Sequence, residues 1–315
     1  MNEDHAAVRW TDDIDAVLGG DLTAALTYVT PAGGAVAVAV APVGLRDREK
    51  GWVAFTTSLG FGKKLERITR DPRVALAYHS REHGTATGDR YVLVQGHAEI
   101  VPQPDPELAA LVRRQATAAL GPPLTGVFWD RWLREYYQVR VPVLVRVRRV
   151  TSWPDLRAAG EPLVLGAAPV PPPAPQNPPA SGTWPRVDVQ RTGDRFRKHP
   201  HRLLSYRGSD GYPVTVPIEV RRVSAEGIEL AAAPGLIPDG ARRAGLLTHS
   251  FGPQLVGLST RYHTGWLSKD ATGKVMYFPH TASGFSAPRQ KALQMFATGL
   301  MAKRGLRASR RASAP

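Results

Sequence analysis

The residues that could do chemistry in this sequence gather in one short segment, where hydroxyl groups are followed closely by paired lysines. Thr56, Thr57 and Ser58 end a strand-like run, and Lys63 and Lys64 follow after two glycines. The lysines stand at the start of an expected helix, where backbone N–H groups and the helix dipole both favour an anion. Hydroxyl donors, cations and a helix start in this order predict a phosphate-binding site.

Two strands and one helix are expected to position this segment. Residues 52–55 are a β-prone run, and 73–79 begins another strand after the turn signal Asp71-Pro72. Between them, Leu65 and Ile68 are spaced as on one face of a short helix. The glycine and lysine spacing matches neither a P-loop nor a dinucleotide-binding fingerprint, so a lysine pair on a solvated helix surface is the alternative interpretation.

The order of these elements resembles the flavin-binding split β-barrel of the pyridoxamine 5′-phosphate oxidase-like superfamily. In that family a strand ends in Thr or Ser, a Lys or Arg a few residues later holds the cofactor phosphate, and a helix closes at a segment like D-P-R-V-A-L, found here at 71–76. Many members also have an Arg in the preceding strand, which is missing from 34–43, and Arg46 is the expected substitute. The resemblance implies that the phosphate is held by Thr56, Thr57, Ser58, Lys63 and Lys64.

The same resemblance places the cofactor ring and a substrate pocket. Gln95 and His97 lie on an expected strand near the point where family members approach the flavin ring. Trp153 is expected to close the first barrel beside the cofactor. The candidates for the substrate pocket are His97, Arg261 and His263, and no side chain is assigned as a catalytic acid or base.

A second, weaker copy of the pattern follows a proline-rich segment. Residues 169–179 include seven prolines in eleven positions and cannot form a helix or a sheet ladder. After it, the hairpin at 26–43 recurs near 204–220, and 241–251 is expected to repeat a helix and the strand that ends at His79. The Thr-Thr-Ser and Lys-Lys motifs are absent from the second copy, so one cofactor site is expected, or a second site that binds a different anion.

The sequence therefore predicts a mainly β fold with helices (α+β), made of two split β-barrels of the FMN-binding type in tandem. Barrels of this family commonly bind their cofactor between two protomers, so two copies in one chain imply a fused pseudo-dimer. The expected domains are residues 1–158 with the cofactor phosphate site, 159–185 as a proline-rich linker, 186–288 as the diverged second barrel, and 289–315 as a C-terminal helix and basic tail.

Three further helices are expected in the first half. One covers 10–20 with Ile14, Val17 and Leu18 on one face, and another runs from Asp105 to about residue 120. The third, at 127–138, is rich in aromatic side chains at helical spacing, which favours burial in a core.

Composition excludes several other chemistries. The chain has no cysteine, which excludes disulfides, thiolate nucleophiles and cysteine-bound metal clusters. Its nine histidines lack zincin spacing and no G-x-S-x-G motif occurs, so neither a metal site nor a serine hydrolase is expected. No stretch is apolar for long enough to span a bilayer and the N-terminus is acidic, which indicates a cytoplasmic protein without a signal peptide.

The formal net charge of +14 raises the question of nucleic acid. Residues 289–315 contain seven basic residues and no acidic one, so half of the excess lies at one end of the chain. We interpret this tail as a solvated helix and basic end, and nucleic acid is not an expected partner. A third hypothesis is a nucleic-acid-associated barrel, which would use this tail and the basic run at 146–149 as its contact surface.

Taken with the resemblance, these observations predict an oxidoreductase that uses FMN or, alternatively, a deazaflavin coenzyme of the F420 type on a small organic substrate. The shortage of acid, base and nucleophile motifs agrees with chemistry carried by a cofactor. A non-catalytic flavin- or haem-binding barrel, or a haem-degrading relative, is the alternative, with haem the weaker choice of cofactor. The expected assembly is a monomeric pseudo-dimer or a homodimer.

Overall fold

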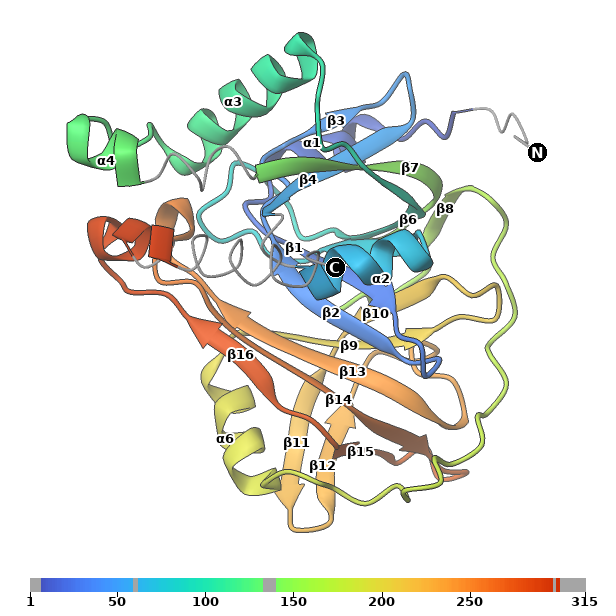
Figure 1. Cartoon of the computed structure of the whole chain (residues 1–315). Coiled ribbons are helices and arrows are strands. Elements are labelled where there is room, and N and C mark those ends of the chain that lie inside the picture. The colour runs from blue at the N-terminus through green and yellow to red at the C-terminus, as the bar shows by residue number, and fades with distance from the viewer. Residues whose placement is uncertain (1–6, 59–61, 133–139, 297–298, 301–315) are drawn as a thin grey trace, which may run out of the picture.

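The computed structural model describes residues 7–58, 62–132, 140–296 and 299–300, which form two antiparallel β-sheets and several helices (Figure 1). The elements of the first half are α1 (Asp12–Gly20), β1 (Ala24–Val29), β2 (Ala35–Val40), β3 (Arg46–Asp47), β4 (Trp52–Ser58), α2 (Gly62–Arg70), β5 (Arg73–Tyr78), β6 (Tyr91–Ile100), α3 (Pro106–Leu120), α4 (Val127–Trp132), β7 (Arg140–Trp153) and β8 (Leu163–Gly166). Those of the second half are α6 (Val189–Lys198), β9 (His201–Arg207), β10 (Pro213–Pro217), β11 (Glu219–Ser224), β12 (Gly227–Ala231), β13 (Gly240–Ser250), the 3-10 helix η1 (Pro253–Leu255), β14 (Ser259–Lys269), β15 (Val275–Pro279) and β16 (Ser283–Ser286).

The two sheets have the same strand order. The first follows β2-β1-β5-β6-β7-β4-β3 and the second follows β10-β9-β13-β14-β15-β12-β11, so each strand of one sheet has a counterpart in the other. Each sheet also has one strand off this path, β8 beside β7 and β16 beside β14. The chain is a tandem of two split β-barrels. The predicted fold class is therefore confirmed.

The repeat is also visible in side chains along β5 and β13. The aligned segments are R-V-A-L-A-Y-H-S at 73–80 and R-A-G-L-L-T-H-S at 243–250. The strand register agrees with this alignment, because Leu76 pairs with Leu26 of β1 as Leu246 pairs with Leu204 of β9. Counterpart positions in the two halves can therefore be compared one by one.

Counterpart residues of the two halves touch each other. Oγ1 of Thr27 lies 3.5 Å from Oγ of Ser205, and Nε2 of His79 lies 2.6 Å from Nε2 of His249. A residue contacts its own counterpart only close to a symmetry axis, so a pseudo-twofold axis passes between the halves at these pairs. One buried hydrophobic cluster contains side chains of both halves. The barrels thus share a core and form the predicted pseudo-dimer within one chain.

The strands at this interface approach each other closely. A Cβ on Gly245 would lie 2.4 Å from the carbonyl oxygen of Ala35, so β13 can pack against β2 there only without a side chain. At the counterpart of Gly245 in the first half, Ala75 does carry a side chain and is fully buried. The pseudo-symmetry is therefore inexact where the sheets meet.

The expected helices of the first half are present. α1 buries Ile14, Val17 and Leu18, and Asp105 caps α3 by accepting a hydrogen bond from the N–H of Leu108. Burial of the aromatic helix at 127–138 is wrong in its described part, since Phe128 of α4 is 57% exposed. The positions from 133 to 138 lie outside the described residues.

The helix expected at the start of 241–251 is wrong, because these residues belong to the single strand β13. β13 lies between β9 and β14 and pairs with β14 over its whole length, so its N–H and C=O groups are used by neighbouring strands. The expected linker also contributes structure, since β8 lies within 159–185 and pairs with β7.

The rest of the linker is extended and docked onto the protein. Residues 168–179 form no helix or strand. The backbone N–H of Gln176 donates to the carbonyl of Ala241 at 2.7 Å, and its side chain accepts from the N–H of Arg243 and donates to the carbonyl of Gly33. One side chain of the linker therefore joins the two halves.

Among the residues that the structure describes, no helix has the length and apolar character needed to cross a membrane.

Candidate functional site

The predicted phosphate site lies where β4 ends and α2 begins. Thr56, Thr57 and Ser58 are the last residues of β4 and are all buried. β4 pairs with β7, and this register places Arg140 opposite Ser58. Nη2 and Nε of Arg140 lie 2.6 and 3.2 Å from Oγ1 of Thr56 and donate to it. The fold therefore adds a guanidinium to the hydroxyls that the sequence had marked.

The hydroxyl of Thr57 is an exception to the usual pairing of buried polar groups. Its Oγ1 is buried and has no hydrogen-bond partner in the described part of the chain. A buried hydroxyl without a partner costs about 1–3 kcal/mol relative to a paired one. Such a group at a strand end, just before a helix start, is suited to a ligand oxygen.

The two lysines differ in their surroundings. Lys63 is exposed on the first turn of α2, whereas Lys64 is half-buried. Burial lowers the pKa of Lys64 to about 7, and the positive charge of Arg140 lowers it further. A bound anion would raise the pKa of Lys64 again.

Arg46, the expected substitute for the family's strand arginine, is held by another partner. Its Nε donates to Oδ1 of Asp15 at 2.8 Å and its Nη2 donates to Oδ2 at 2.6 Å. This hydrogen bonding is the main cause that lowers the pKa of Asp15. Arg46 would have to leave a bidentate ion pair to reach a cofactor phosphate.

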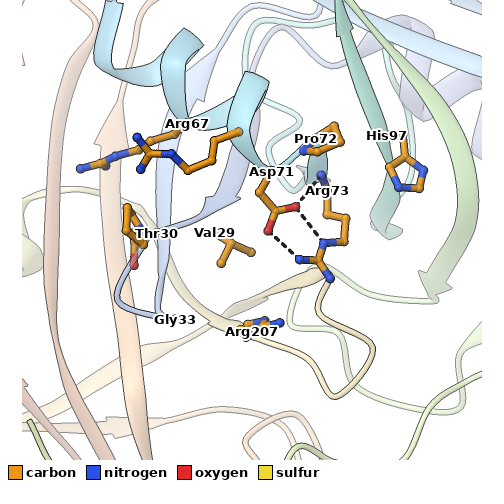
Figure 2. Close-up of a pocket in the computed structure, with 11 residues that line it drawn as sticks. Val29, Thr30, Gly33, Arg67, Asp71, Pro72, Arg73, His97 and Arg207 are labelled. Atoms are coloured by element: carbon orange, nitrogen blue, oxygen red, sulfur yellow. Dashed lines mark hydrogen bonds and ion pairs between the residues drawn. The ribbon is translucent and has the colours of Figure 1, made fainter.

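His97 lies away from the end of β4, at a cleft on the opposite end of α2. Figure 2 shows His97 in this cleft together with Arg73, which is paired with the carboxylate of Asp71. The hydroxyl of Tyr212, in the second half, lies 3.1 Å from Nε2 of His97. Partial burial and then the positive charges of Arg148 and Arg73 lower the pKa of His97.

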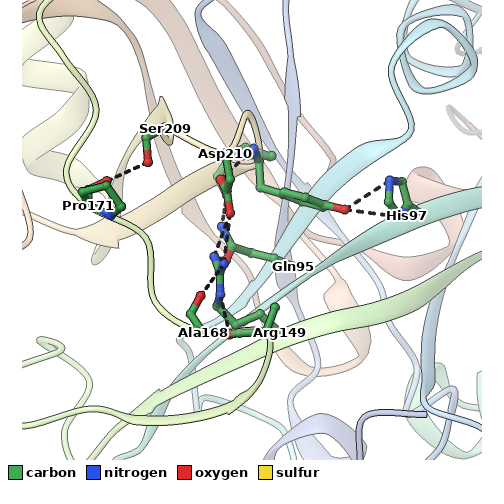
Figure 3. Close-up of polar contacts among 10 residues, drawn as sticks. Gln95, His97, Arg149, Ala168, Pro171, Ser209 and Asp210 are labelled. Atoms are coloured by element: carbon green, nitrogen blue, oxygen red, sulfur yellow. Dashed lines mark hydrogen bonds and ion pairs between the residues drawn. The ribbon is translucent and has the colours of Figure 1, made fainter. Parts of the chain in front are cut away.

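Gln95 and Trp153 contribute to the joint between the halves. Gln95 is buried, donates to the carbonyl of Pro213 at 2.8 Å and accepts from Arg149 at 2.9 Å (Figure 3). The ring of Trp153 packs edge-on against Tyr91, with 5.6 Å between the ring centroids. Both side chains are thus engaged where β6 and β7 meet the second half.

Arg149 is the centre of that joint. It is 6% exposed and donates to one carboxylate oxygen of Asp210 from both Nη1 and Nη2, at 3.0 Å each (Figure 3). Its other hydrogen bonds go to Gln95 and to the carbonyls of Ala167 and Ala168. Because Arg149 is buried and paired with Asp210, it cannot contact nucleic acid as the hypothesis for 146–149 would require.

Arg261 and His263 make their contacts within the second half. Arg261 donates to the carbonyl of Phe285 at 2.8 Å and to the hydroxyl of Ser286 at 3.0 Å, which fixes β16 against β14. His263 is buried against Phe196 of α6, and burial lowers its pKa to about 4. The structure does not bring these two residues to the end of β4.

A different part of the second half faces the end of β4. Thr56 forms an isolated β-bridge with Ala41. Ala41 and Ala54 belong to a buried cluster that also contains Phe251 and Leu255 of the second half. The part of the second half that packs near β4 is therefore the segment after β13, and no sequence motif marked it in advance.

Arg140 is the site residue that sequence reasoning missed. It begins the basic strand that the sequence predicts at 139–151, but basic residues are frequent along that strand. Only the pairing of β7 with β4, 84 residues apart at this contact, singles Arg140 out. The available signal was the expectation that the last strand of a barrel closes against an early one.

Comparisons with known proteins give structural neighbours only. No protein-family model and no curated protein sequence matches the chain. A conserved hypothetical protein from Mycobacterium tuberculosis is 22% identical over 50% of this chain and 92% of its own, with a TM-score of 0.35. An F420 reductase is 24% identical over 48% of this chain and 98% of its own, with a TM-score of 0.30.

A third neighbour is a pyridoxamine 5′-phosphate oxidase-related, FMN-binding protein from Nostoc punctiforme. It is 13% identical over 63% of this chain and 87% of its own, with a TM-score of 0.30. Proteins named for the family that the sequence resembles are thus among the neighbours. With TM-scores this low, the likenesses carry no conclusion about chemistry, which has to come from the site itself.

The residues at the end of β4 fit a cofactor that carries a phosphate. A phosphate oxygen would give Thr57 the hydrogen bond it lacks. Lys64 and Arg140 supply two cations, and N–H groups at the start of α2 supply further donors.

Proposed function

We propose that this chain is a flavin- or deazaflavin-dependent oxidoreductase that acts on a small organic substrate. Its cofactor phosphate binds at the end of β4 through Thr57, Ser58, Lys64 and Arg140, with Lys63 at the exposed rim. The bound cofactor supplies hydride transfer. The observation that supports this best is the buried, unpartnered hydroxyl of Thr57 at the end of β4, shortly before Lys64, whose pKa is lowered to about 7 by burial and then by the charge of Arg140.

The protein's own residues would bind and orient the cofactor. Lys64 and Arg140 would neutralise the phosphate in charge-assisted hydrogen bonds. Phe251 and Leu255 line the face of the second half beside β4 and would exclude water from the apolar part of the cofactor. One such site is proposed per chain, because the second half has alanines where the first has Thr57 and Ser58.

Spectroscopic titration of the protein with FMN, and separately with a deazaflavin coenzyme, tests the proposal. We expect Lys64→Gln to weaken binding by about 10-fold or more, because a charge-assisted hydrogen bond is lost. The matched control is Lys198→Gln, which removes an exposed lysine at the end of α6 and should leave binding unchanged. Failure of the unaltered protein to bind either cofactor would exclude the oxidoreductase.

Thr57→Val separates binding from folding. Valine has the shape of threonine without the hydroxyl, so the cofactor-free protein should become more stable by about 1 kcal/mol in urea unfolding. The same change should weaken cofactor binding, because the phosphate loses a donor. A loss of stability in the cofactor-free protein would show that Thr57 already has a partner.

A further inference from the structure

A second basic site lies between the two halves, at the C-terminal end of α2. A cleft of about 510 Å³ is bounded by the β1–β2 turn, the residues that follow α2, and the end of β9 (Figure 2). Small-molecule sites commonly have volumes of about 300–1,000 Å³. The charged and titratable side chains that line the cleft are Arg67, Arg70, Arg73, Arg207, His97 and Asp71.

The carboxylates near the cleft are already used. Both oxygens of Asp71 accept hydrogen bonds from Arg73, at 2.8 and 2.7 Å (Figure 2). Arg70 pairs with Glu66 at 2.7 Å on the surface of α2. These two carboxylates therefore do not neutralise the other two arginines of the cleft, Arg67 and Arg207.

Arg67 and Arg207 are those two arginines, and they come from different halves. Neither has a carboxylate within 4 Å among the residues described by the structure. Arg67 lies over the ring of Tyr28, with 5.8 Å from its guanidinium carbon to the ring centroid. Nε of Arg207 is buried without a hydrogen-bond partner in the same set of residues.

The arginine charges also shift the pKa values of two neighbouring groups, Asp71 and His97. Hydrogen bonds from Arg73 lower the pKa of Asp71 most, and the charge of Arg207 contributes to the shift. The pKa of His97 is lowered by partial burial and by two arginine charges. An anion entering the cleft would therefore be attracted before it makes any contact.

The counterpart surface in the second half is covered. Residues 241–243 correspond to 71–73, and the linker lies on them through the hydrogen bonds of Gln176 and of Pro173, whose carbonyl accepts from Arg242 at 3.0 Å. At 71–73 the cover is different, because the loop at Gly211 lies against Arg73 but a cleft remains beside it. The open copy of this surface is the one lined by four arginines.

We propose that this cleft binds a small molecule through a phosphate or carboxylate group held between Arg67 of the first half and Arg207 of the second. The planar guanidinium fork matches both kinds of oxyanion. The site stands at the opposite end of α2 from the proposed cofactor phosphate and does not depend on it. It exists only because the halves are docked.

Calorimetric titration with inorganic phosphate, and in a second arm with succinate, tests the cleft and distinguishes the two oxyanions. The measurements use Lys64→Gln protein, so that binding of the probe at the proposed cofactor site does not contribute to the measured heat. We expect binding of at least one probe, weakened 10-fold or more by Arg207→Gln and also by Arg67→Gln. Arg222→Gln, which removes an exposed arginine of β11, should leave the affinity unchanged.

Two results would overturn the proposal. One is the absence of binding of both probes, and the other is binding that neither arginine substitution weakens. If Arg207→Gln does not fold, Arg67→Gln decides alone, because Arg67 lies on α2 in the other half. Loss of FMN binding in Lys64→Gln with phosphate binding retained would show that the two sites are separate.

Discussion

The connection between β4 and β5 and the connection between β12 and β13 occupy the same place in the two sheets, but only the first contains a helix. In the first half, α2 follows the hydroxyl residues that end β4 and carries both lysines at its start. In the second half, residues 232–239 form a loop whose Leu236 and Ile237 are buried. The strand order is the same in both sheets, whereas this connection differs between the halves.

The residues that follow these connections, 71–73 in the first half and 241–243 in the second, differ in what covers them. The linker lies over 241–243 in the second half, and the cleft remains beside 71–73 in the first. One half thus uses this surface to fix the chain that joins the barrels, and the other leaves a cleft beside it. Duplication followed by fusion would produce this asymmetry, because only one linker is present for two equivalent surfaces.

The largest expected effect concerns the joint that makes the two halves one unit. Asp210→Asn leaves the buried guanidinium of Arg149 without a counter-charge, and we expect a loss of about 3 kcal/mol in the free energy of unfolding. Glu99→Gln, which alters an exposed ion pair with Arg146, should change it by less than about 0.5 kcal/mol. Equal effects in urea unfolding would mean that the halves fold independently of this joint.

The next effect tests the histidine pair on the pseudo-twofold axis. Nδ1 of His79 lies 2.9 Å from the carbonyl of Ala77 and must donate to it, so Nε2 of His79 accepts from His249. Burial lowers the pKa of His79 to about 3 and lowers that of His249 strongly. Both side chains are therefore neutral in the folded protein near neutral pH.

Acid should weaken the fold through this pair. Below pH 6.5, near the ordinary histidine pKa, both histidines take up protons in the unfolded chain but stay neutral in the folded protein. The free energy of unfolding therefore falls by about 1.4 kcal/mol per pH unit for each histidine. His79→Gln should remove one histidine's share of that slope between pH 6 and 4. The exposed control His83→Gln should retain the full slope, and an unchanged slope in His79→Gln would contradict the assignment.

The smallest effect concerns the covered surface. Gln176→Ala removes the side-chain hydrogen bonds to Arg243 and Gly33, which should cost about 1–2 kcal/mol in unfolding. Asn177→Ala in the same linker is the control for a general change of linker sequence. Hydrogen exchange at Ala241–Arg243 should rise in Gln176→Ala alone if the linker protects this strand.

Much of the fold followed from local sequence patterns. Alternation and turn signals placed the hairpin, the strands around the lysine pair and the capped helix that begins after Asp105. The pattern failed at β13, where A-R-R-A-G-L-L has helix-forming residues but lies between two strands. Neighbouring strands overrode local preference there, because a central strand satisfies its backbone groups on both sides.

The sequence by itself determined the hydroxyl and lysine segment, the tandem repeat and the absence of cysteine chemistry. Only the tertiary structure decided which distant groups join that segment, bringing Arg140 to Thr56 and committing Arg46 to Asp15. It also drew Gln95 into the joint between the halves and placed Arg207 against the first half. The reason is physical: hydrophobic periodicity and turn residues act over a few positions, whereas strand pairing and barrel docking join residues far apart in the chain.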